Sequence, residues 1–309
     1  MKNRKFVALS CGLPPFLSIP SRVSSHLSFL DNRATEKGLL YPISVDMNLC
    51  MLKDWKEKLQ FSKMRVFNIS HLDSLISLLL PDDEIHLWKI FTNDCVSKVN
   101  ELEALLSKEE MGRVERFHFK KDKIRFIAAH GMLRKIIGRY LNLSPHRVVF
   151  KNNSKGKPKL QKNCGVETLS FNISHSHDLM IVALSRYPNL GIDVEFIRPI
   201  PGLQEIVNNF FHPEERSAFM RIPLCKRQKL FFYYWTRKEA FVKATGEGLT
   251  RKFDSFSVSM SGETEKWCNE INNSIFSVDR DWERPENWNV LSLLPAPGYT
   301  GALVFPKFR

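Results

Sequence analysis

The sequence predicts an α/β (α+β) protein built from two similar halves that divide near residue 189. Three observations favour this class. A continuous apolar run at residues 179–184 fits a strand that is buried on both faces. Two long segments with helical periodicity, one before this run and one after it, are flanked by strand-like segments, as in α/β units. A chain of 309 residues with 43% apolar side chains is also long enough for two domain-sized units.

The elements of the predicted first half lie in residues 84–188. Residues 85–90 alternate only partly but lie between turn residues, which indicates the first strand. Residues 102–106 and 111–141 predict a long helical region, because apolar side chains recur at spacings of three and four. The remaining segments are strands at 147–150, 169–173 and 179–184 and a polar loop at 151–158.

The second half comprises residues 189–309. A turn at 186–189 leads into a strand at 191–195, and the simplest interpretation is a hairpin with the apolar run before it. Gly246 and Gly248 are expected to end the last helix, because glycine readily adopts the left-handed conformation of a helix C-cap. The other elements are helices at 204–211, 213–220 and 229–243 and strands at 253–260, 289–294 and 299–305.

Residues 1–83 are set apart as an N-terminal extension of unknown role. The first thirty residues contain four basic residues, six serines and no acid, a composition shared with organellar transit peptides. We expect this extension to be poorly ordered or wrongly assigned to the protein. Met47, Met51 and Met64 are alternative starts, and organellar targeting stays open.

The formal net charge of +13 predicts a polyanionic partner, but it does not choose among nucleic acid, an anionic membrane, a phosphorylated ligand and an acidic protein. No run of 18 apolar residues is present, so no membrane span is expected. The six cysteines are scattered without metal-ligand spacing, which indicates a reducing, cytoplasmic setting.

Two short segments concentrate charge in patterns that favour a site. In the strand at 191–195, Asp193 and Glu195 stand two positions apart and therefore point to the same face. Glu239 and Lys243 stand four positions apart on a helix, so they lie one above the other. Carboxylates without a His or Cys partner favour Mg²⁺ over zinc, with Mn²⁺ as a substitute, and Mg²⁺ commonly shares a phosphate with its protein ligands.

These segments are Gly-Ile-Asp-Val-Glu at 191–195 and Trp-Thr-Arg-Lys-Glu-Ala-Phe-Val-Lys at 235–243, which runs on to Gly-Glu-Gly-Leu at 246–249. They resemble the 4′-phosphopantetheinyl transferases of the surfactin-synthetase-activating (Sfp) type. The resemblance covers roughly residues 84–309. It includes further short matches at 116–125, 156–158, 172–176, 253–256 and 297–299.

The resemblance implies two pseudo-twofold-related α/β subdomains, each a small sheet with a long helix packed on it, and an active site in the cleft between them. It further implies transfer of phosphopantetheine from coenzyme A to a serine of an apo carrier protein, with release of 3′,5′-ADP. Asp193, Glu195 and Glu239 would hold Mg²⁺ with the pyrophosphate. Glu239 would also take the serine proton, and Lys243 would stabilise the departing phosphate.

By the same resemblance, coenzyme A would contact a set of basic and polar side chains. The set is Lys157, Ser174, His175, Arg116 and Arg125, together with Asp193 and Lys243. The sequence differs from the family at one place, because acidic Glu109 and Glu110 stand where the family has a basic residue. This difference weakens the expectation that the helical region, with Arg116 and Arg125, contacts coenzyme A. His175 also fits a hydrogen-bonded core histidine when taken alone.

The expected partner is an acidic apo carrier protein or carrier domain of a fatty-acid, polyketide or nonribosomal-peptide synthase, and the expected oligomeric state is a monomer. The carrier would dock on an apolar patch made by Leu203, Ile206, Phe210 and Phe211, unless these residues pack in the core. Two other functions stay open. One is a basic nucleic-acid-binding protein, although the chain has no known nucleic-acid-binding motif. The other is a catalytically silent homologue that binds coenzyme A.

Overall fold

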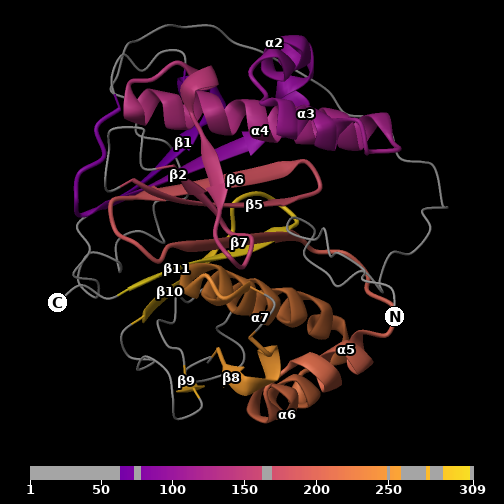
Figure 1. The fold of residues 1–309 in the computed structure, drawn as a ribbon. Helices are drawn as coiled ribbons and strands as arrows, with labels where there is room; N and C mark the ends of the chain where they lie inside the picture. The colour runs from indigo at the N-terminus through magenta and orange to yellow at the C-terminus, as the bar shows by residue number, and fades with distance from the viewer. Residues whose placement is uncertain are drawn as a thin grey trace, which may run out of the picture.

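The structure is a computed structural model that describes residues 63–72, 78–161, 169–248, 251–258, 276–278 and 288–306. Most of the predicted extension, residues 1–62, lies outside the described residues, as do Leu249 and Met260. The described chain alternates strands and helices, which confirms the predicted α/β class (Figure 1).

The first sheet has four strands. Their order is β1 (Lys63–Asn68), β2 (Glu84–Phe91), β6 (Leu179–Ser185) and β5 (Ser170–Ser176). β1 pairs in parallel with β2, while the β2–β6 and β6–β5 pairs are antiparallel. Every residue of β6 is buried, as the apolar run predicts.

β1 lies inside the stretch 1–83 that was set apart as an extension, so the sheet begins before the predicted boundary at residue 84. Phe67 stacks on Trp88 with ring centroids 4.8 Å apart, and Arg65 forms an ion pair with Glu84 at 2.9 Å. β1 is an edge strand with an exposed arginine, and within the sheet it pairs only with β2.

Helices cover one face of this sheet (Figure 1). They follow the 3₁₀ segment Thr92–Lys98 and are α2 (Val99–Ala104), α3 (Lys108–Val114) and α4 (Lys120–Leu141). The continuous helix predicted at 111–141 is therefore wrong at one point, because α3 ends at Val114 and α4 begins only at Lys120. Phe119 has extended backbone angles and begins α4, whose 22 residues end at the left-handed Asn142.

The strand predicted at 147–150 is displaced. Pro145–Arg147 forms a 3₁₀ turn, and a small hairpin follows, made of β3 (Phe150–Asn152) and β4 (Pro158–Leu160). The polar loop predicted at 151–158 thus contributes its ends to strands. Its tip is organised by Asn153, whose side-chain oxygen accepts the backbone N–H groups of Lys155 and Lys157.

The second sheet has the order β10 (Trp288–Leu293), β11 (Tyr299–Pro306) and β7 (Gly191–Phe196), with antiparallel pairing throughout. The hairpin predicted between 179–184 and 191–195 is therefore wrong. Both edges of β6 are already taken by β2 and β5, so the chain crosses from one sheet to the other at residues 186–190.

The helices of the second half are α5 (Leu203–Phe210), α6 (Pro213–Arg221) and α7 (Leu224–Thr245). α7 ends as predicted, with Gly246 in the left-handed conformation at φ 74°. The strand predicted at 253–260 is reduced to the 3₁₀ turn Phe253–Ser255 and β8 (Phe256–Ser257), which pairs with β9 (Phe276–Val278).

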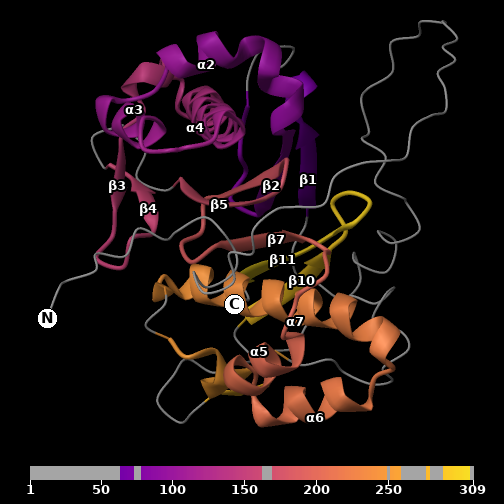
Figure 2. The same ribbon diagram turned by 90° about the vertical axis from the view of Figure 1, so that its right-hand side faces the viewer.

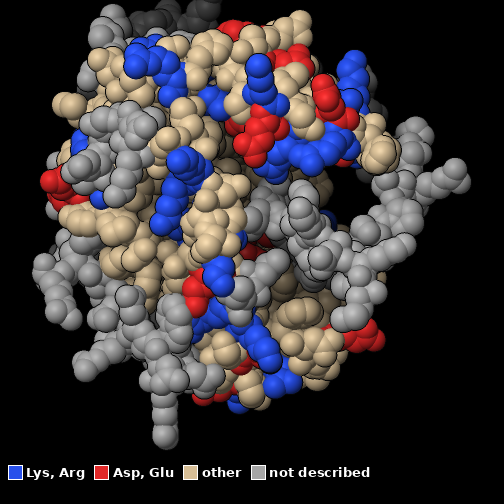
Figure 3. All heavy atoms as spheres, viewed as in Figure 1, with Lys and Arg blue, Asp and Glu red and all other residues tan. Residues whose placement is uncertain are grey.

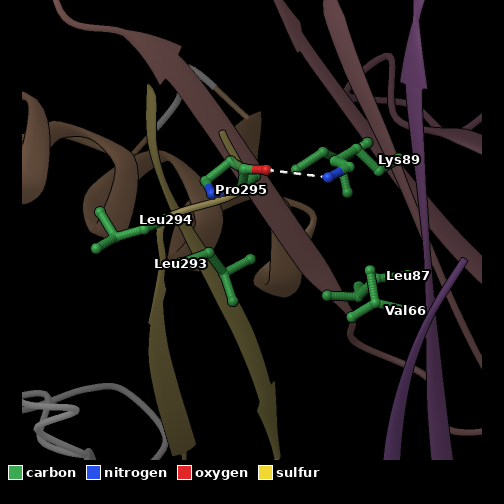
Figure 4. A pocket seen from close by; sticks show the side chains of 7 residues that line it. Val66, Leu87, Lys89, Leu293, Leu294 and Pro295 are labelled. Atoms are coloured by element: carbon green, nitrogen blue, oxygen red, sulfur yellow. Dashed lines mark hydrogen bonds between the residues drawn. The ribbon is translucent and has the colours of Figure 1, made fainter. Parts of the chain in front are cut away.

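The two sheets lie face to face between α4 on one side and α7 on the other, and α5 and α6 lie beyond α7 (Figure 2). Three apolar clusters fill the three spaces: α4 against the first sheet, sheet against sheet, and α7 against the second sheet. A cavity of about 30 Å³ remains between the sheets, where the Lys89 ammonium donates to the Pro295 carbonyl at 3.4 Å (Figure 4). Its other walls are mostly apolar, so the cavity is a packing defect and not a polar site. Among the described residues, no helix has the length and apolarity needed to cross a bilayer.

A buried ion pair joins α3 to α4. Glu110 accepts hydrogen bonds from Arg134 at 2.8 Å and from the backbone of Ser107 at 2.8 Å, and it contacts His130 at 3.0 Å. Burial alone would raise the pKa of Glu110, but the hydrogen bonds from His130 and Ser107 and the charge of Arg134 lower it to about 2. Glu110 therefore holds the first half together instead of opposing a bound anion.

The lowered pKa of Glu110 predicts a specific acid sensitivity. A carboxylate with a lowered folded-state pKa contributes stability above its unfolded-state pKa, and that stability is lost as the pH falls toward 2. We expect Glu110→Gln to remove roughly 3 kcal/mol of stability at pH 7 and almost none near pH 2. Urea unfolding across this range measures it, with the exposed neighbour Glu109→Gln as the control. If the free energy of unfolding fell with pH in the same way in both variants, the stabilising role of the Glu110 carboxylate would be contradicted.

Candidate active site

Three elements meet at the candidate site: β5 from the first half and β7 and α7 from the second. Gly191 lets β7 lie directly against α7, because a Cβ at this position would lie 2.0 Å from the Ala240 carbonyl oxygen and 2.5 Å from the Ala244 nitrogen. Both of these atoms belong to the helix backbone and cannot yield. The glycine therefore sets the distance between the strand and the helix that carry the charged residues.

Gly191→Ala is expected to destabilise the protein by about 1–3 kcal/mol, because the added methyl forces the strand and the helix apart. Gly112→Ala is the matched control, since a Cβ there meets nothing within 4 Å. That change on α3 should stabilise the helix by about 0.5–1 kcal/mol. Thermal unfolding of the two variants gives the comparison, and equal melting temperatures would refute the close approach.

Asp193 is the centre of the site. Its Oδ1 accepts hydrogen bonds from the Lys243 ammonium at 2.6 Å and from the Ser174 hydroxyl at 2.8 Å, and Lys243 also lies 3.2 Å from Ser174 Oγ. The residue is only 2% exposed, and Asp193 Oδ2 is buried with no hydrogen-bond partner in the described structure. A buried carboxylate oxygen without a partner is costly unless a cation or donor meets it.

Glu195 lies two residues along the same strand face and is also 2% exposed. Its Oε2 accepts hydrogen bonds from the Ser176 hydroxyl at 2.7 Å and from Arg198 at 3.2 Å. Burial and the neighbouring charge of Asp193 raise the pKa of Glu195 to about 7. The two carboxylates therefore oppose each other's ionisation, which is the condition that a bound cation relieves.

Glu239 and Lys243 occupy neighbouring turns of α7. Burial and the charge of Asp193 raise the pKa of Glu239 to about 7. Burial alone would lower the pKa of Lys243, but the carboxylates of Asp193 and Glu239 raise it. The site thus contains a lysine that stays charged and a carboxylate whose pKa suits general-base work near neutral pH.

The three predicted ligands do not form an assembled metal cage. Within the described ranges, no group of three or more His, Cys, Asp and Glu side chains is arranged to hold a metal ion. The donor set is nevertheless suited to a hard cation, because it offers carboxylate oxygens, one of which lacks any partner. Lys243 supplies the compensating positive charge in this arrangement.

The predicted coenzyme A contacts are distributed unevenly. Ser174 lies at the centre of the site, while His175, its neighbour on β5, points to the other face of the strand. Burial and the nearby charge of Lys243 lower the pKa of His175 to about 4, so its imidazole is neutral at pH 7. Arg125 pairs with Asp178 at 2.6 Å in the turn after β5. Arg116 is exposed just after α3 and contacts none of these residues.

Lys157 has partners that sequence reasoning did not anticipate. Its ammonium donates to the carbonyl of Lys243 at 2.5 Å and to the carbonyl of Leu190 at 3.0 Å. Burial lowers the pKa of Lys157 to about 8, and the charges of Lys159 and Lys243 add to the effect. A lysine that binds the last carbonyls of a helix stabilises the helix end, so Lys157 ties the β3–β4 hairpin to α7.

The docking patch predicted on α5 is largely buried. Phe211 is 0% exposed and stacks on Phe231 with centroids 5.5 Å apart, and Ile206 is 7% exposed. These two residues belong to the apolar cluster around α7, because α5 is amphipathic and presents its apolar face inward. Only Phe210, at 38% exposure, and part of Leu203 reach the surface.

Sequence reasoning missed Asn172 and Ser176 as residues of the site. With Ser174 they form an alternating polar series on β5, and all three are buried. The signal was present, because polar side chains at every second position of an otherwise apolar strand form one polar face. The exposed Lys and Arg side chains are spread across the face drawn in Figure 3, so the high net charge is not concentrated in one stripe there.

The chain is similar to a known family of proteins over both of its halves. Residues 189–288 match a family model described as the 4′-phosphopantetheinyl transferase superfamily, and residues 93–186 match one described as 4′-phosphopantetheinyl transferase, N-terminal. The chain is 41% identical over 175 residues to 4′-phosphopantetheinyl transferase HetI of Nostoc sp., covering 57% of this chain and 74% of that protein.

Two Bacillus proteins are also similar to the chain. It is 30% identical over 177 residues to 4′-phosphopantetheinyl transferase psf-1 of Bacillus pumilus, covering 57% of this chain and 73% of that protein. It is 32% identical over 157 residues to 4′-phosphopantetheinyl transferase Sfp of Bacillus subtilis, covering 51% of this chain and 67% of that protein. Of the strands in the two sheets, the family models together cover β5, β6 and β7, and the first-named match ends at Trp288, the first residue of β10.

Proposed function

The chain belongs to the 4′-phosphopantetheinyl transferase family, and we propose that its donor substrate is coenzyme A and that Mg²⁺ is its cofactor. As a member of this family the chain is an enzyme that transfers phosphopantetheine to carrier proteins. The acceptor atom is the hydroxyl of a carrier serine, and the second product is 3′,5′-ADP.

The observation that carries the proposal is the buried Asp193 carboxylate, which contacts Lys243 through one oxygen and has an unpaired second oxygen. Asp193, Glu195 and Glu239 would hold Mg²⁺, for which this oxygen donor set is suited. Bound Mg²⁺ supplies positive charge to a pyrophosphate.

Glu239 is the proposed general base. Its pKa of about 7 leaves a substantial ionised fraction at neutral pH, so it can take the proton of a serine hydroxyl. Lys243 lies one helical turn further along α7 and stays protonated. Its ammonium is therefore placed to stabilise the negative charge that develops on the departing phosphate.

His175, Ser174 and the basic residues of the first half would meet the nucleotide end of coenzyme A. Arg125 is now paired with Asp178, and Lys157 is bound to two carbonyls, so each would have to exchange partners to contact a phosphate. Arg125 is about one-third exposed and can do so at modest cost. Lys157 is the weaker candidate, because its release would strand two carbonyls.

The carrier is proposed to be an acidic protein, because the net charge of +13 favours encounter with a negative partner. Of the residues first considered for docking, Phe210 and Leu203 retain accessible surface. Burial of Ile206 and Phe211 removes them from the docking set.

The deciding experiment incubates the full chain with coenzyme A, Mg²⁺ and an apo carrier protein and then weighs the carrier by mass spectrometry. We expect the mass increment of one phosphopantetheine group and a matching yield of 3′,5′-ADP. Several carriers from fatty-acid, polyketide and nonribosomal-peptide systems are needed, because the site does not select among them. No increment on any carrier, with coenzyme A still bound, would instead support a silent homologue.

A further inference from the structure

The strands β5 and β7 join the two halves of the protein. The hydrogen bonds between them go to side chains of β5, whereas neighbouring strands of a sheet bond through their backbones. β11 pairs with one edge of β7, and β5 lies along the other edge. Three N–H groups on that edge, those of Ile192, Val194 and Phe196, donate to β5 side chains. Their acceptors, in the same order, are Asn172 Oδ1 at 2.8 Å, Ser174 Oγ at 3.1 Å and Ser176 Oγ at 3.1 Å.

This junction also fixes the direction of the Ser176 hydroxyl. Ser176 Oγ accepts the N–H of Phe196, so its own proton is free to be donated, and Glu195 Oε2 lies 2.7 Å away. In its ionised form, which is the form that binds a cation, the Glu195 carboxylate only accepts hydrogen bonds, so Ser176 is then the donor in this contact. The hydroxyl therefore links the strand junction directly to the carboxylate.

Few other groups control the orientation of Glu195. Its side chain is 2% exposed, and its other partner, Arg198, is 31% exposed and comes from the segment after β7. Both hydrogen bonds go to Oε2, and no residue in the described part of the chain hydrogen-bonds Oε1. Ser176 thus fixes one oxygen of the carboxylate and leaves the other available for a ligand.

We propose that Ser176 is a positioning residue for the divalent-cation site, which it serves by fixing the Glu195 carboxylate through a hydrogen bond from the opposite half of the protein. The inference rests on the proposed function, since it assumes that Glu195 is a ligand. Ser174 has the same geometry toward Asp193 but also contacts Lys243. Ser176 contacts no such lysine, so its replacement isolates the positioning effect.

The test measures binding of Mn²⁺ to the full chain in the presence of coenzyme A, from the paramagnetic resonance signal of the free ion. Ser176→Ala is expected to weaken Mn²⁺ binding about tenfold or more, as loss of a hydrogen bond to a metal ligand commonly does. The Mg²⁺ concentration for half-maximal transfer should rise by a similar factor. Ser176→Thr keeps the hydroxyl and should restore both values.

Two further variants separate positioning from stability. Ser170→Ala removes a hydroxyl from the same strand and face that contacts neither carboxylate in the described structure, and should leave Mn²⁺ binding unchanged. Ser176→Cys keeps a side chain of similar shape but offers a weaker hydrogen-bond donor, so it should also weaken Mn²⁺ binding. This variant provides the test if the alanine variant does not fold. Unchanged Mn²⁺ affinity in the folded Ser176→Ala or Ser176→Cys variant would overturn the inference, whatever its melting temperature.

The parent protein separates failure of this inference from failure of the proposed function. A parent chain that neither transfers phosphopantetheine nor binds Mn²⁺ would refute the proposed function and the inference with it. A parent that does both, beside Ser176→Ala and Ser176→Cys variants with parent-like Mn²⁺ affinity, would refute the inference alone.

Discussion

Glu239→Gln is expected to lower kcat for phosphopantetheine transfer by about 10²–10⁴, because the amide cannot accept the serine proton. The fold should be retained or slightly stabilised. Burial and Asp193 raise the pKa of Glu239, so its ionised form costs stability at neutral pH, and a neutral amide removes that cost. Asp193→Ala should abolish transfer as well, but with a loss of stability, because it strands the Lys243 ammonium.

The measurement is steady-state transfer to an apo carrier, combined with urea unfolding of each variant. Glu205→Gln is the matched control, since it makes the same chemical change on the exposed face of α5 in the same half. It should leave both kcat and stability near the parent values. Full activity of Glu239→Gln would show that another group takes the proton, and it would remove Glu239 from the site.

Lys238→Met is expected to destabilise the protein by about 3–5 kcal/mol, although Lys238 is the immediate neighbour of Glu239. Lys238 is 0% exposed and pairs with Glu215 at 2.9 Å, and its ammonium also donates to the carbonyls of Phe253 and Phe256. Burial raises the pKa of Glu215 and lowers the pKa of Lys238, so each charge depends on the other. Removing the lysine leaves a buried carboxylate without its cation.

A second substitution tests this cause. Lys238→Met combined with Glu215→Gln removes the stranded charge but keeps an acceptor for the Val258 N–H, so it should recover part of the lost stability. Lys135→Met is the control, because Lys135 pairs with Glu101 at the surface and should cost no more than about 1 kcal/mol. Free energies of unfolding in urea give all three values. A single Lys238 variant as stable as the Lys135 variant would contradict the buried pair.

The contrast between Lys238 and Glu239 shows where sequence reasoning reached its limit. Both lie in the same motif, and an α-helix turns adjacent residues about 100° apart, so they face different surroundings. The i,i+4 spacing predicted that Glu239 and Lys243 share a face, and their raised pKa values agree with a shared electrostatic environment. The local sequence pattern did not predict that Lys238 would be fully buried, because its partner Glu215 lies on another helix.

The same limit explains the strands. The apolar run that became β6 was predictable, because a strand buried on both faces has a continuous apolar sequence. The partners of β6 were not predictable. Instead of forming the expected hairpin with β7, β6 pairs with β2 and β5 in the first sheet, and β7 belongs to the second sheet. β1 was missed because its mixed sequence does not alternate regularly, and its place in the sheet is set by pairing with β2.

The α/β class, the position of α7 and its glycine end, and the two carboxylates on one face of β7 all follow from the amino-acid pattern. Each of these depends on short spacings, which the periods of helices and strands make readable. The groups that meet those carboxylates are brought there by packing between distant parts of the chain. Ser176 and Glu195 are 19 residues apart and Asp193 and Lys243 are 50 apart, and such contacts arise only when strands and helices from both halves pack together.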